Sequence, residues 1–440
     1  MILKAGGVLL FFSKAVFFFA MLGVFFIGQN IFYEQTVFYY WGNYVVLLIY
    51  AAILYFTCKI YNGFRFGTVG LQEIILSWML CLFITNALEY LKLSLLFGSL
   101  LPATGILAIF AAQAALAALL SCCIDKLYFF LNPAHQAIII YSSEKKAGDY
   151  SEILQKHKNR FEISQIASQE RPDEELRGLI DGAESVFFLD VDEKIRDPLT
   201  AYCFKNNKRI YILPTFSGVL LNAAEVLIIS NTPVFLSKNP FPGVGARAVK
   251  RGMDIILSLV GMILLSWLML IVIIAIRVCD GGPAIYKQTR LTIGGKLFTM
   301  YKFRSMRVGA AESGLTEKND SRITSVGGFI RKTRIDELPQ LFNVLLGSMS
   351  LVGPRPERPE IAAIYESLYP GFSLRTKVKA GLTCYAHVYG KYSTPPEERL
   401  LMDIMYIERA SVWQDLMLIL QTIKIPFMPS TAEGISKEGG

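Results

Sequence analysis

Histidine and paired cysteines are scarce in this 440-residue sequence. It has only three His, and its seven Cys are scattered without a CxxC pair. This argues against a zinc site, a His-based metal site or a disulfide framework, and suits free thiols in a reducing compartment. Charged residues are also sparse, at 18%, against 53% hydrophobic residues. The chain is therefore too apolar for an ordinary soluble protein.

The apolar residues are concentrated in a few long runs that contain almost no charge. Four of them lie near 8–28, 40–60, 72–93 and 99–122. Each is long enough to cross a bilayer, which takes about 20 residues. The first is not a cleavable signal, because it has no small-residue cleavage site and three more runs follow it. We expect a four-helix transmembrane bundle over residues 1–125.

Basic residues predict the orientation of these spans. The loop 28–42 between the first two contains no Lys or Arg. The other connections and the flanks carry Lys4, Lys14, Lys59, Arg65 and Lys126. Because Lys and Arg accumulate on the cytoplasmic side, we expect both termini and everything after residue 125 to be cytoplasmic.

Residues 133–240 have the pattern of an α/β domain. Short apolar strands are expected at 137–141, 161–167, 185–191 and 209–213, separated by polar, helix-favouring stretches. This alternation is typical of a parallel sheet. The turn after the first strand, SSEKKAGDY, lacks the glycine-rich pattern that lets a backbone approach a pyrophosphate. We therefore expect a Rossmann-like domain with a structural or regulatory role that binds no NAD.

A Pro- and Gly-rich linker, 239–245, leads to a fifth apolar segment at 255–276. Basic residues flank that segment on both sides: Lys250 and Arg251 before it, and Lys287, Arg290, Lys296, Lys302, Arg304 and Arg307 after it. The positive-inside rule disfavours a plain crossing of such a segment. A re-entrant or interfacial helix resolves the conflict. The alternative is a true fifth span with the remainder of the chain outside the cell.

An acidic pair, Asp336 and Glu337, follows a basic cluster. That cluster consists of Arg331, Lys332 and Arg334. Pro339 suits the first turn of a helix, so we expect a helix to start near Asp336 and to run through LPQLFNVLL. The ordinary interpretation is a capping acid at a helix start. The other is a carboxylate kept ionised by nearby cations, as a nucleophile or a magnesium ligand must be.

Three further stretches carry weaker signals. In GPRPERP, 353–359, prolines hold Arg355 and Arg358 on a stiff frame that suits phosphate binding. In 286–306 we expect a β-hairpin with Lys302 and Arg304 on one face. Each could instead be a solvated basic segment, and NDSRIT, 319–324, could be a local ion pair. The tail 398–425 predicts two amphipathic helices with Trp413, packed into the core or else lying at a membrane interface.

Taken together, these motifs resemble a known family. From Lys250 to about Ile425 the sequence is similar to the bacterial sugar transferases, or monotopic phosphoglycosyl transferases. The resemblance is carried by KRGMDI, GGPAIYKQTR, GKLFTMYKFRSM, NDSRIT, RKTRIDELPQLFNVLLGSMSLVGPRPERPE and DIMYIERASVWQDL. With four preceding spans and an α/β domain, the chain resembles the large members. These are undecaprenyl-phosphate galactose or glucose phosphotransferases that initiate capsule, exopolysaccharide or O-antigen (lipopolysaccharide) synthesis.

The resemblance implies a role for each matching residue. Asp336 would be the nucleophile and Glu337 its partner, with Mg²⁺ at the pair and Asp336 as its ligand. Phosphate-contacting cations would be Lys302, Arg304, Arg331, Arg355 and Arg358. The catalytic domain would cover 247–430, with interfacial helices and a re-entrant helix at about 250–277 that includes Lys250, Arg251, Asp254, Ser266 and Trp267. The implied fold class is membrane α plus α/β.

The resemblance also implies partners and a location. These are a UDP-hexose, undecaprenyl phosphate, the lipid bilayer and a second copy in a homodimer, at the cytoplasmic face of the bacterial inner membrane. A formal charge of +8 suits anionic lipid and a phosphate substrate. Nucleic acid would suit that charge too, but no recognition motif supports it, so we expect none.

The sequence departs from the family pattern at several positions. Trp267 stands where a proline usually breaks the membrane helix, which leaves Gly261 or Ser266 to cause the break. Ala380, Cys384 and His387 replace the usual Pro, Gly and Gln in a region expected to shape the sugar end of the site. Thr292 replaces a glycine in the hairpin turn.

Other functions stay open at this point. The donor could be an N-acetylated UDP-sugar. The chain could be a catalytically idle scaffold that organises a polysaccharide assembly complex through its first 240 residues, although the intact acidic pair argues against this. A membrane-anchored nucleotide-sugar dehydratase or epimerase would need the glycine-rich loop that the α/β domain lacks.

Overall fold

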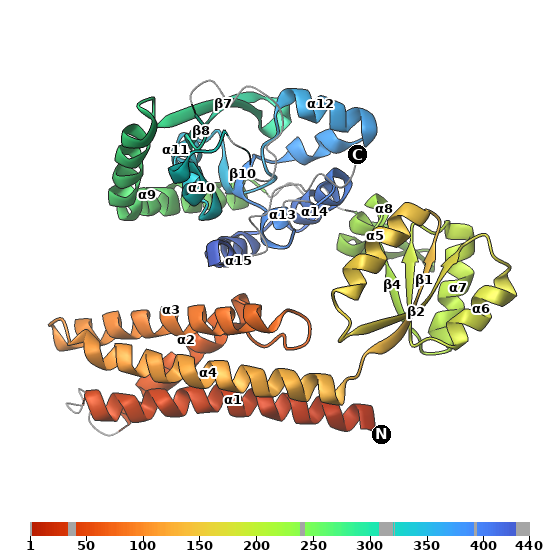
Figure 1. Cartoon of the computed structure of the whole chain (residues 1–440), viewed down its shortest axis with the longest axis horizontal. Coiled ribbons are helices and arrows are strands. Elements are labelled where there is room, and N and C mark those ends of the chain that lie inside the picture. Colours follow the sequence, from red (N-terminus) through yellow and green to blue (C-terminus); the bar gives the residue numbers. More distant parts are fainter. Residues whose placement is uncertain are drawn as a thin grey trace. The chain divides into compact units, whose positions relative to one another are not determined.

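The computed structural model describes residues 2–33, 41–237, 243–307, 320, 322–390 and 394–427. Most of the expected linker, 239–242, and parts of the loop 28–42 and of NDSRIT lie outside the described residues. The chain forms two compact units, Met1–Leu213 and Pro214–Gly440. Figure 1 shows their helices and strands.

The first unit begins with four long apolar helices. They are α1 (Ile2–Phe32), α2 (Gly42–Ile60), α3 (Leu71–Phe97) and α4 (Ala103–Leu131). Each is long and apolar enough to cross a membrane, as predicted. Within the unit α1 packs on α4, α4 on α3 and α3 on α2. Their outer faces expose large apolar side chains such as Phe11, Leu48 and Leu119, which suits contact with lipid.

A buried polar network links these four helices. Gln113 on α4 donates to the hydroxyl of Tyr50 on α2 at 3.0 Å and to the carbonyl of Met21 on α1 at 2.9 Å. Asn86 on α3 donates to the Gln113 side chain at 2.8 Å. Because an unpaired polar group is costly among apolar helices, this network favours one arrangement of the four.

A parallel α/β sheet completes the first unit. Its elements are β1 (His135–Tyr141), α5 (Glu144–Gln155), β2 (Phe161–Ser168), α6 (Asp173–Asp181), β3 (Ser185–Leu189), α7 (Glu193–Lys205) and β4 (Arg209–Ile212). The strand order is β2-β1-β3-β4, and all three pairings are parallel. The four strands therefore lie where the apolar runs predicted them.

The second unit opens with α8 (Phe216–Ala223) and the hairpin of β5 (Glu225–Ile229) and β6 (Thr232–Leu236). Then follow α9 (Val244–Asp280), β7 (Ile285–Leu291), β8 (Leu297–Phe303), α10 (Ser325–Lys332), α11 (Gln340–Leu346), β9 (Ser350–Val352), α12 (Pro359–Leu368), β10 (Gly381–Thr383), α13 (Tyr385–Val388), α14 (Pro396–Glu408) and α15 (Val412–Thr422). Strands β7 and β8 form the expected antiparallel hairpin.

The two C-terminal helices, α14 and α15, confirm the predicted amphipathic pair. Leu400, Ile404 and Leu418 join the main core of the second unit. Trp413 does not, because 56% of it is exposed. The core interpretation is therefore right for the aliphatic face and wrong for the tryptophan.

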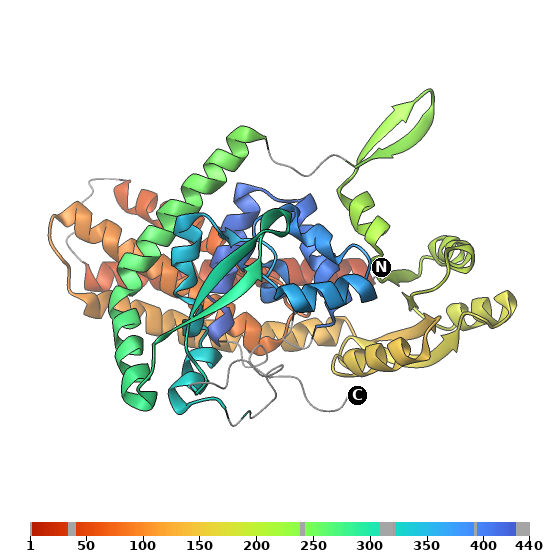
Figure 2. The ribbon, with the colours of Figure 1, turned by 90° about the horizontal axis from the view of Figure 1, so that it is seen from above.

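Helix α9 is continuous from Val244 to Asp280, yet it bends, and its two halves run in different directions (Figures 1 and 2). No proline is needed at Trp267 for this. Within the bent region the Ser266 hydroxyl donates to the carbonyl of Ile263 at 2.8 Å. Such a bond to the preceding turn often bends a helix.

The KRGMD motif fastens the first half of α9 to the rest of the second unit. Lys250 donates to the Val352 carbonyl at 3.1 Å. Arg251 donates to the carbonyls of Val344 and Leu345 at 2.6 and 2.7 Å, at the end of α11. Buried Asp254 accepts the backbone N–H of Leu351 at 3.0 Å.

The second half of α9 packs on the same unit. Val272 and Ile276 share a buried cluster with Phe303 of β8 and Ile330 of α10. At its end, Asp280 lies 3.2 Å from Arg304. Both halves of α9 therefore contact other elements of the second unit.

Strands β9 and β10 pair in parallel at the centre of this unit, with Gly381 opposite Ser350 and Thr383 opposite Val352. The segment that leaves β9 approaches the first residue of β10 very closely. A Cβ on Gly381 would lie 2.1 Å from the backbone nitrogen of Gly353. Glycine is therefore needed there for space rather than for a turn.

We expect Gly381→Ala to destabilise the protein by about 1–3 kcal/mol, because the added methyl forces β9 and β10 apart. The measurement is the thermal midpoint of the full chain in detergent. Gly328→Ala is the control, since a Cβ there has its nearest neighbour at 4.0 Å. Equal midpoints for the two variants would contradict the expected clash.

Candidate active site

The acidic pair lies in a tight turn between two helices. Asp336 and Glu337 belong to a 3-10 turn, Ile335–Glu337, and α11 begins only at Gln340. The expectation of a helix that starts near Asp336 is therefore wrong by about one turn. The cause lies just before the pair, because Arg334 has a left-handed backbone with φ +60°. This conformation changes the chain direction after α10 and leads into the 3-10 turn.

Glu337 is clamped by three cations. Its Oε1 accepts from Lys302 Nζ at 3.1 Å and from Arg355 Nη2 at 3.0 Å. Arg334 Nη1 lies 3.9 Å away. Burial alone would raise the pKa of Glu337, but the charges of Lys302 and Arg355 outweigh it and hold the pKa well below its usual range. Glu337 is thus ionised, and its carboxylate is bound by Lys302 and Arg355.

Asp336 differs from its neighbour. It is also buried, but among the described residues no cation lies within ion-pair distance of its carboxylate. Burial, together with the negative charge of Glu337, raises the pKa of Asp336 to about 6. One carboxylate of the pair is therefore a fixed counter-ion, and the other is available for chemistry.

The structure brings some of the predicted cations to this pair and leaves others elsewhere. Lys302 and Arg355 contact Glu337, and the charge of Arg331 acts on Asp336. Arg304 instead pairs with Asp280, at the end of α9. Arg358 precedes α12 as its N-cap residue.

Arg334 is a site residue that sequence reasoning passed over. It was visible only as one member of the basic cluster before the pair. Its contact with Glu337 depends on its left-handed backbone. No sequence pattern signals that conformation in an arginine.

A second ion network fixes the segment that carries Arg355. Arg375 donates to the Arg355 carbonyl at 2.9 Å, and Arg290 donates to the Pro356 carbonyl at 3.0 Å. Both arginines also lie near the Glu357 carboxylate, at 3.5 and 3.8 Å. The stiff frame expected from the prolines is therefore held by arginines as well.

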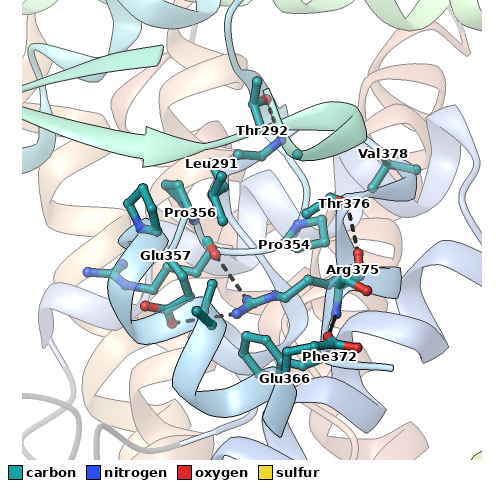
Figure 3. A pocket seen from close by; sticks show the side chains of 17 residues that line it. Leu291, Thr292, Pro354, Pro356, Glu357, Glu366, Phe372, Arg375, Thr376 and Val378 are labelled. Carbon is teal, nitrogen blue, oxygen red and sulfur yellow. Dashed lines mark hydrogen bonds and ion pairs between the residues drawn. The ribbon is translucent and has the colours of Figure 1, made fainter. Parts of the chain in front are cut away.

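A pocket of about 300 Å³ adjoins this frame. Figure 3 shows Pro354 and Pro356 along it, Leu291 and Thr292 from the β7–β8 turn, and Phe372 and Glu366 across from them. Arg355 belongs to both places, since it lines the pocket and bonds Glu337. A cavity of this size can hold part of a small-molecule substrate.

Thr292, unusual in its turn, has a clear structural role. Its hydroxyl donates to the Ser348 carbonyl at 2.8 Å and accepts the backbone N–H of Ala380 at 3.3 Å. It thus ties the hairpin turn to the segments that enter β9 and β10.

We expect opposite effects on stability from neutralising the two acids. Glu337→Gln leaves Lys302 and Arg355 without their counter-ion. This should cost on the order of 2–3 kcal/mol, below the about 3–5 kcal/mol for a fully buried pair, because the Arg355 side chain is 36% exposed. Asp336→Asn should keep or raise stability at pH 7.5, since a pKa above its ordinary value means that the folded state disfavours the ionised form.

Thermal midpoints of both variants at pH 7.5 measure this difference. A loss of stability in Asp336→Asn equal to that in Glu337→Gln would contradict the division of roles within the pair.

Comparison with known proteins agrees with this geometry. The family described as bacterial sugar transferase matches residues 245–428. The UDP-glucose:undecaprenyl-phosphate glucose-1-phosphate transferase of Klebsiella pneumoniae is 37% identical over 230 residues, which cover 51% of this chain and 49% of the relative. The chain thus spans about half the length of that relative.

The match with this chain covers a larger share of the length of two other relatives. The undecaprenyl-phosphate galactose phosphotransferase of Salmonella typhimurium is 31% identical over 66% of this chain and 67% of its own length. A Bacillus subtilis protein, named a putative undecaprenyl-phosphate N-acetylgalactosaminyl 1-phosphate transferase, is 50% identical over 29% of this chain and 73% of its own. The resemblance found from the motifs is confirmed, and the chain belongs to the bacterial sugar transferase family.

Proposed function

We propose that this protein transfers hexose 1-phosphate from a UDP-hexose to undecaprenyl phosphate, releasing UMP. The observation that carries the proposal is the unequal acidic pair, with Glu337 clamped by cations and Asp336 unpaired beside them. Relatives named for UDP-glucose and for galactose transfer to undecaprenyl phosphate support it. An idle scaffold would have no use for a buried carboxylate that is costly to ionise.

The chemistry takes two steps at one phosphorus. A carboxylate oxygen of Asp336 attacks the β-phosphorus of the donor, the bond to the α-phosphate oxygen breaks, and UMP leaves with that electron pair. A phosphate oxygen of undecaprenyl phosphate then attacks the sugar-phosphoryl aspartate and frees Asp336. Lys302, Arg331 and Arg355 would screen the phosphate charges in both steps. Such a covalent route is expected to show ping-pong kinetics.

The residues present suit a magnesium ion held largely by substrate. Among the described residues no cluster of three or more His, Cys, Asp or Glu could hold a metal. Mg²⁺ is often bound by one or two carboxylates together with substrate phosphates, and the carboxylate free for this is that of Asp336. When bound there, the ion would neutralise charge on the diphosphate.

We further propose that α9 enters and leaves the bilayer on one side. Its two halves both fasten to the second unit, through Arg251 and Asp254 at one end and Ile276 at the other. Between these anchors the helix exposes apolar residues, among them Ile263, Leu264, Trp267 and Leu270. A helix that carried the unit across the membrane would not have both halves packed on it.

This topology places the acidic pair at the cytoplasmic face of the bacterial inner membrane, where a soluble nucleotide sugar can meet a lipid acceptor. The proposal includes the homodimer implied by the resemblance and a structural or regulatory role for the parallel sheet of the first unit.

For the chemistry, we expect the full-length protein with Mg²⁺ and a UDP-hexose, but without acceptor, to release about one UMP per site. Asp336→Asn should release none, because the covalent step is lost. Chromatography of UMP measures this, across UDP-glucose, UDP-galactose and N-acetylated UDP-sugars. Asp149→Asn, the same change at an exposed position of α5, is the control and should release UMP normally. Normal turnover by Asp336→Asn would exclude Asp336 as the nucleophile.

For the topology, we expect Lys59→Cys and Glu360→Cys to react with a membrane-impermeant maleimide from the same side, and Trp41→Cys from the opposite side. The background replaces Cys122, Cys123 and Cys279, the described cysteines that are not buried, by serine. Inside-out vesicles and intact cells give the two sides. Reaction of Glu360→Cys together with Trp41→Cys would show a true fifth span.

A further inference from the structure

His387 is a partly buried side chain whose ring nitrogens have no partner in the part of the chain that the structure describes. Both ring nitrogens are closed to solvent, and neither has a hydrogen-bond partner among the described residues. Buried polar atoms are usually paired, since leaving them unpaired lowers stability. An unpaired group at the edge of a reactive site therefore indicates a position that a ligand contacts.

Strand pairing places His387 beside the acidic pair. Because β9 and β10 run in parallel, the segments that follow them leave from the same edge of the small sheet. Arg355 follows β9, and His387 lies in α13, which follows β10. The charges of Glu337, Arg334, Arg355 and Lys302 all act on the His387 ring. The imidazole thus borders the clamp around Glu337.

The ring at this position is neutral. Burial lowers the pKa of His387 to about 3; the charge of Glu337 opposes this effect, and Arg334, Arg355 and Lys302 lower the pKa further. A neutral imidazole offers one N–H donor and one lone-pair acceptor. The cations of the site, such as Lys302 and Arg355, offer only hydrogen-bond donors.

This difference between His387 and the cations indicates which kind of chemical group His387 can bind. Phosphate oxygens at pH 7 only accept hydrogen bonds, so they suit Lys302 and Arg355 but not the acceptor nitrogen of His387. A hydroxyl both donates and accepts, and can therefore pair with either ring nitrogen. On a UDP-hexose, the hydroxyls nearest the reacting phosphate belong to the sugar.

We propose that His387 binds a hydroxyl of the donor's hexose and so helps determine which sugar the enzyme accepts. This inference rests on the proposed transfer of hexose 1-phosphate. It gives a function to one of the family departures found in the sequence. Cys384, another departure, precedes α13 as its N-cap residue, and its carbonyl accepts the His387 backbone N–H at 3.0 Å.

The test combines variants with altered donors. His387→Phe keeps a planar ring and removes both nitrogens, whereas His387→Gln keeps one donor and one acceptor. Each full-length variant is assayed for UMP release with the UDP-hexose that the wild type turns over best, and with its 2-, 3-, 4- and 6-deoxy forms. The inhibition constant of UDP, which lacks the hexose, is measured in parallel.

We expect His387→Phe to lower kcat/KM for the parent donor about tenfold to a hundredfold, since a site built for a hydroxyl rejects its loss strongly. One deoxy donor should be as poor for the wild type, and His387→Phe should not distinguish it from the parent. His387→Gln should restore most of the rate. UDP inhibition should be unchanged, and the thermal midpoint without ligand should not fall, because the ring nitrogens bond no described residue of the protein.

Other results would overturn the inference. If wild type and His387→Phe discriminate equally against every deoxy donor, His387 contacts no sugar hydroxyl. If UDP inhibition weakens in step with the rate, His387 serves the nucleotide instead. A lower thermal midpoint would indicate a structural role. If the wild type releases UMP from no UDP-hexose, the proposed function itself fails, and the assignment of His387 falls with it.

Discussion

The clamp on Glu337 is the interaction on which the site depends. Lys302 reaches it from β8, Arg355 from the segment after β9, and Arg334 from the turn before the pair. No two of these elements are adjacent in sequence, so the carboxylate acts as the common counter-ion of three separate chain segments. Three positive charges so close together would otherwise repel one another in a buried site. Because all three pair with Glu337, Asp336 has no ion pair with them in the described structure.

This clamp is joined to the membrane helix through one short strand. Leu351 in β9 donates to Asp254 of α9, and the next carbonyl, that of Val352, accepts from Lys250. Arg355 follows only three residues later. A displacement of the first half of α9 would therefore be passed to the arginine that holds Glu337. Hydrogen bonds of Asp254 and Lys250 thus connect this apolar helix with the strand that leads to the charged site.

The sequence predicted what depends on local pattern. Apolar length and period gave the four long helices, the parallel strands and the β7–β8 hairpin, and the motifs identified the family. It did not predict what depends on tertiary contact. The helix expected at Asp336 begins at Gln340 because Arg334 adopts a left-handed conformation. Arg304, predicted as a phosphate-contacting cation, pairs with Asp280 at the end of α9, a partner that no local pattern indicates.

The bend in α9 is the clearest case of a tertiary cause. A proline would break the helix locally by removing a backbone donor, and Trp267 cannot do this. In this chain the two halves are instead fixed at both ends, by Arg251 and Asp254 before the bend and by Ile276 after it. Packing of both halves on one compact unit supports the curved form, and Ser266 adds a hydroxyl that bonds back to Ile263. The missing proline therefore removes one cause of the bend without removing the bend, and the Trp267 side chain that stands in its place is 62% exposed.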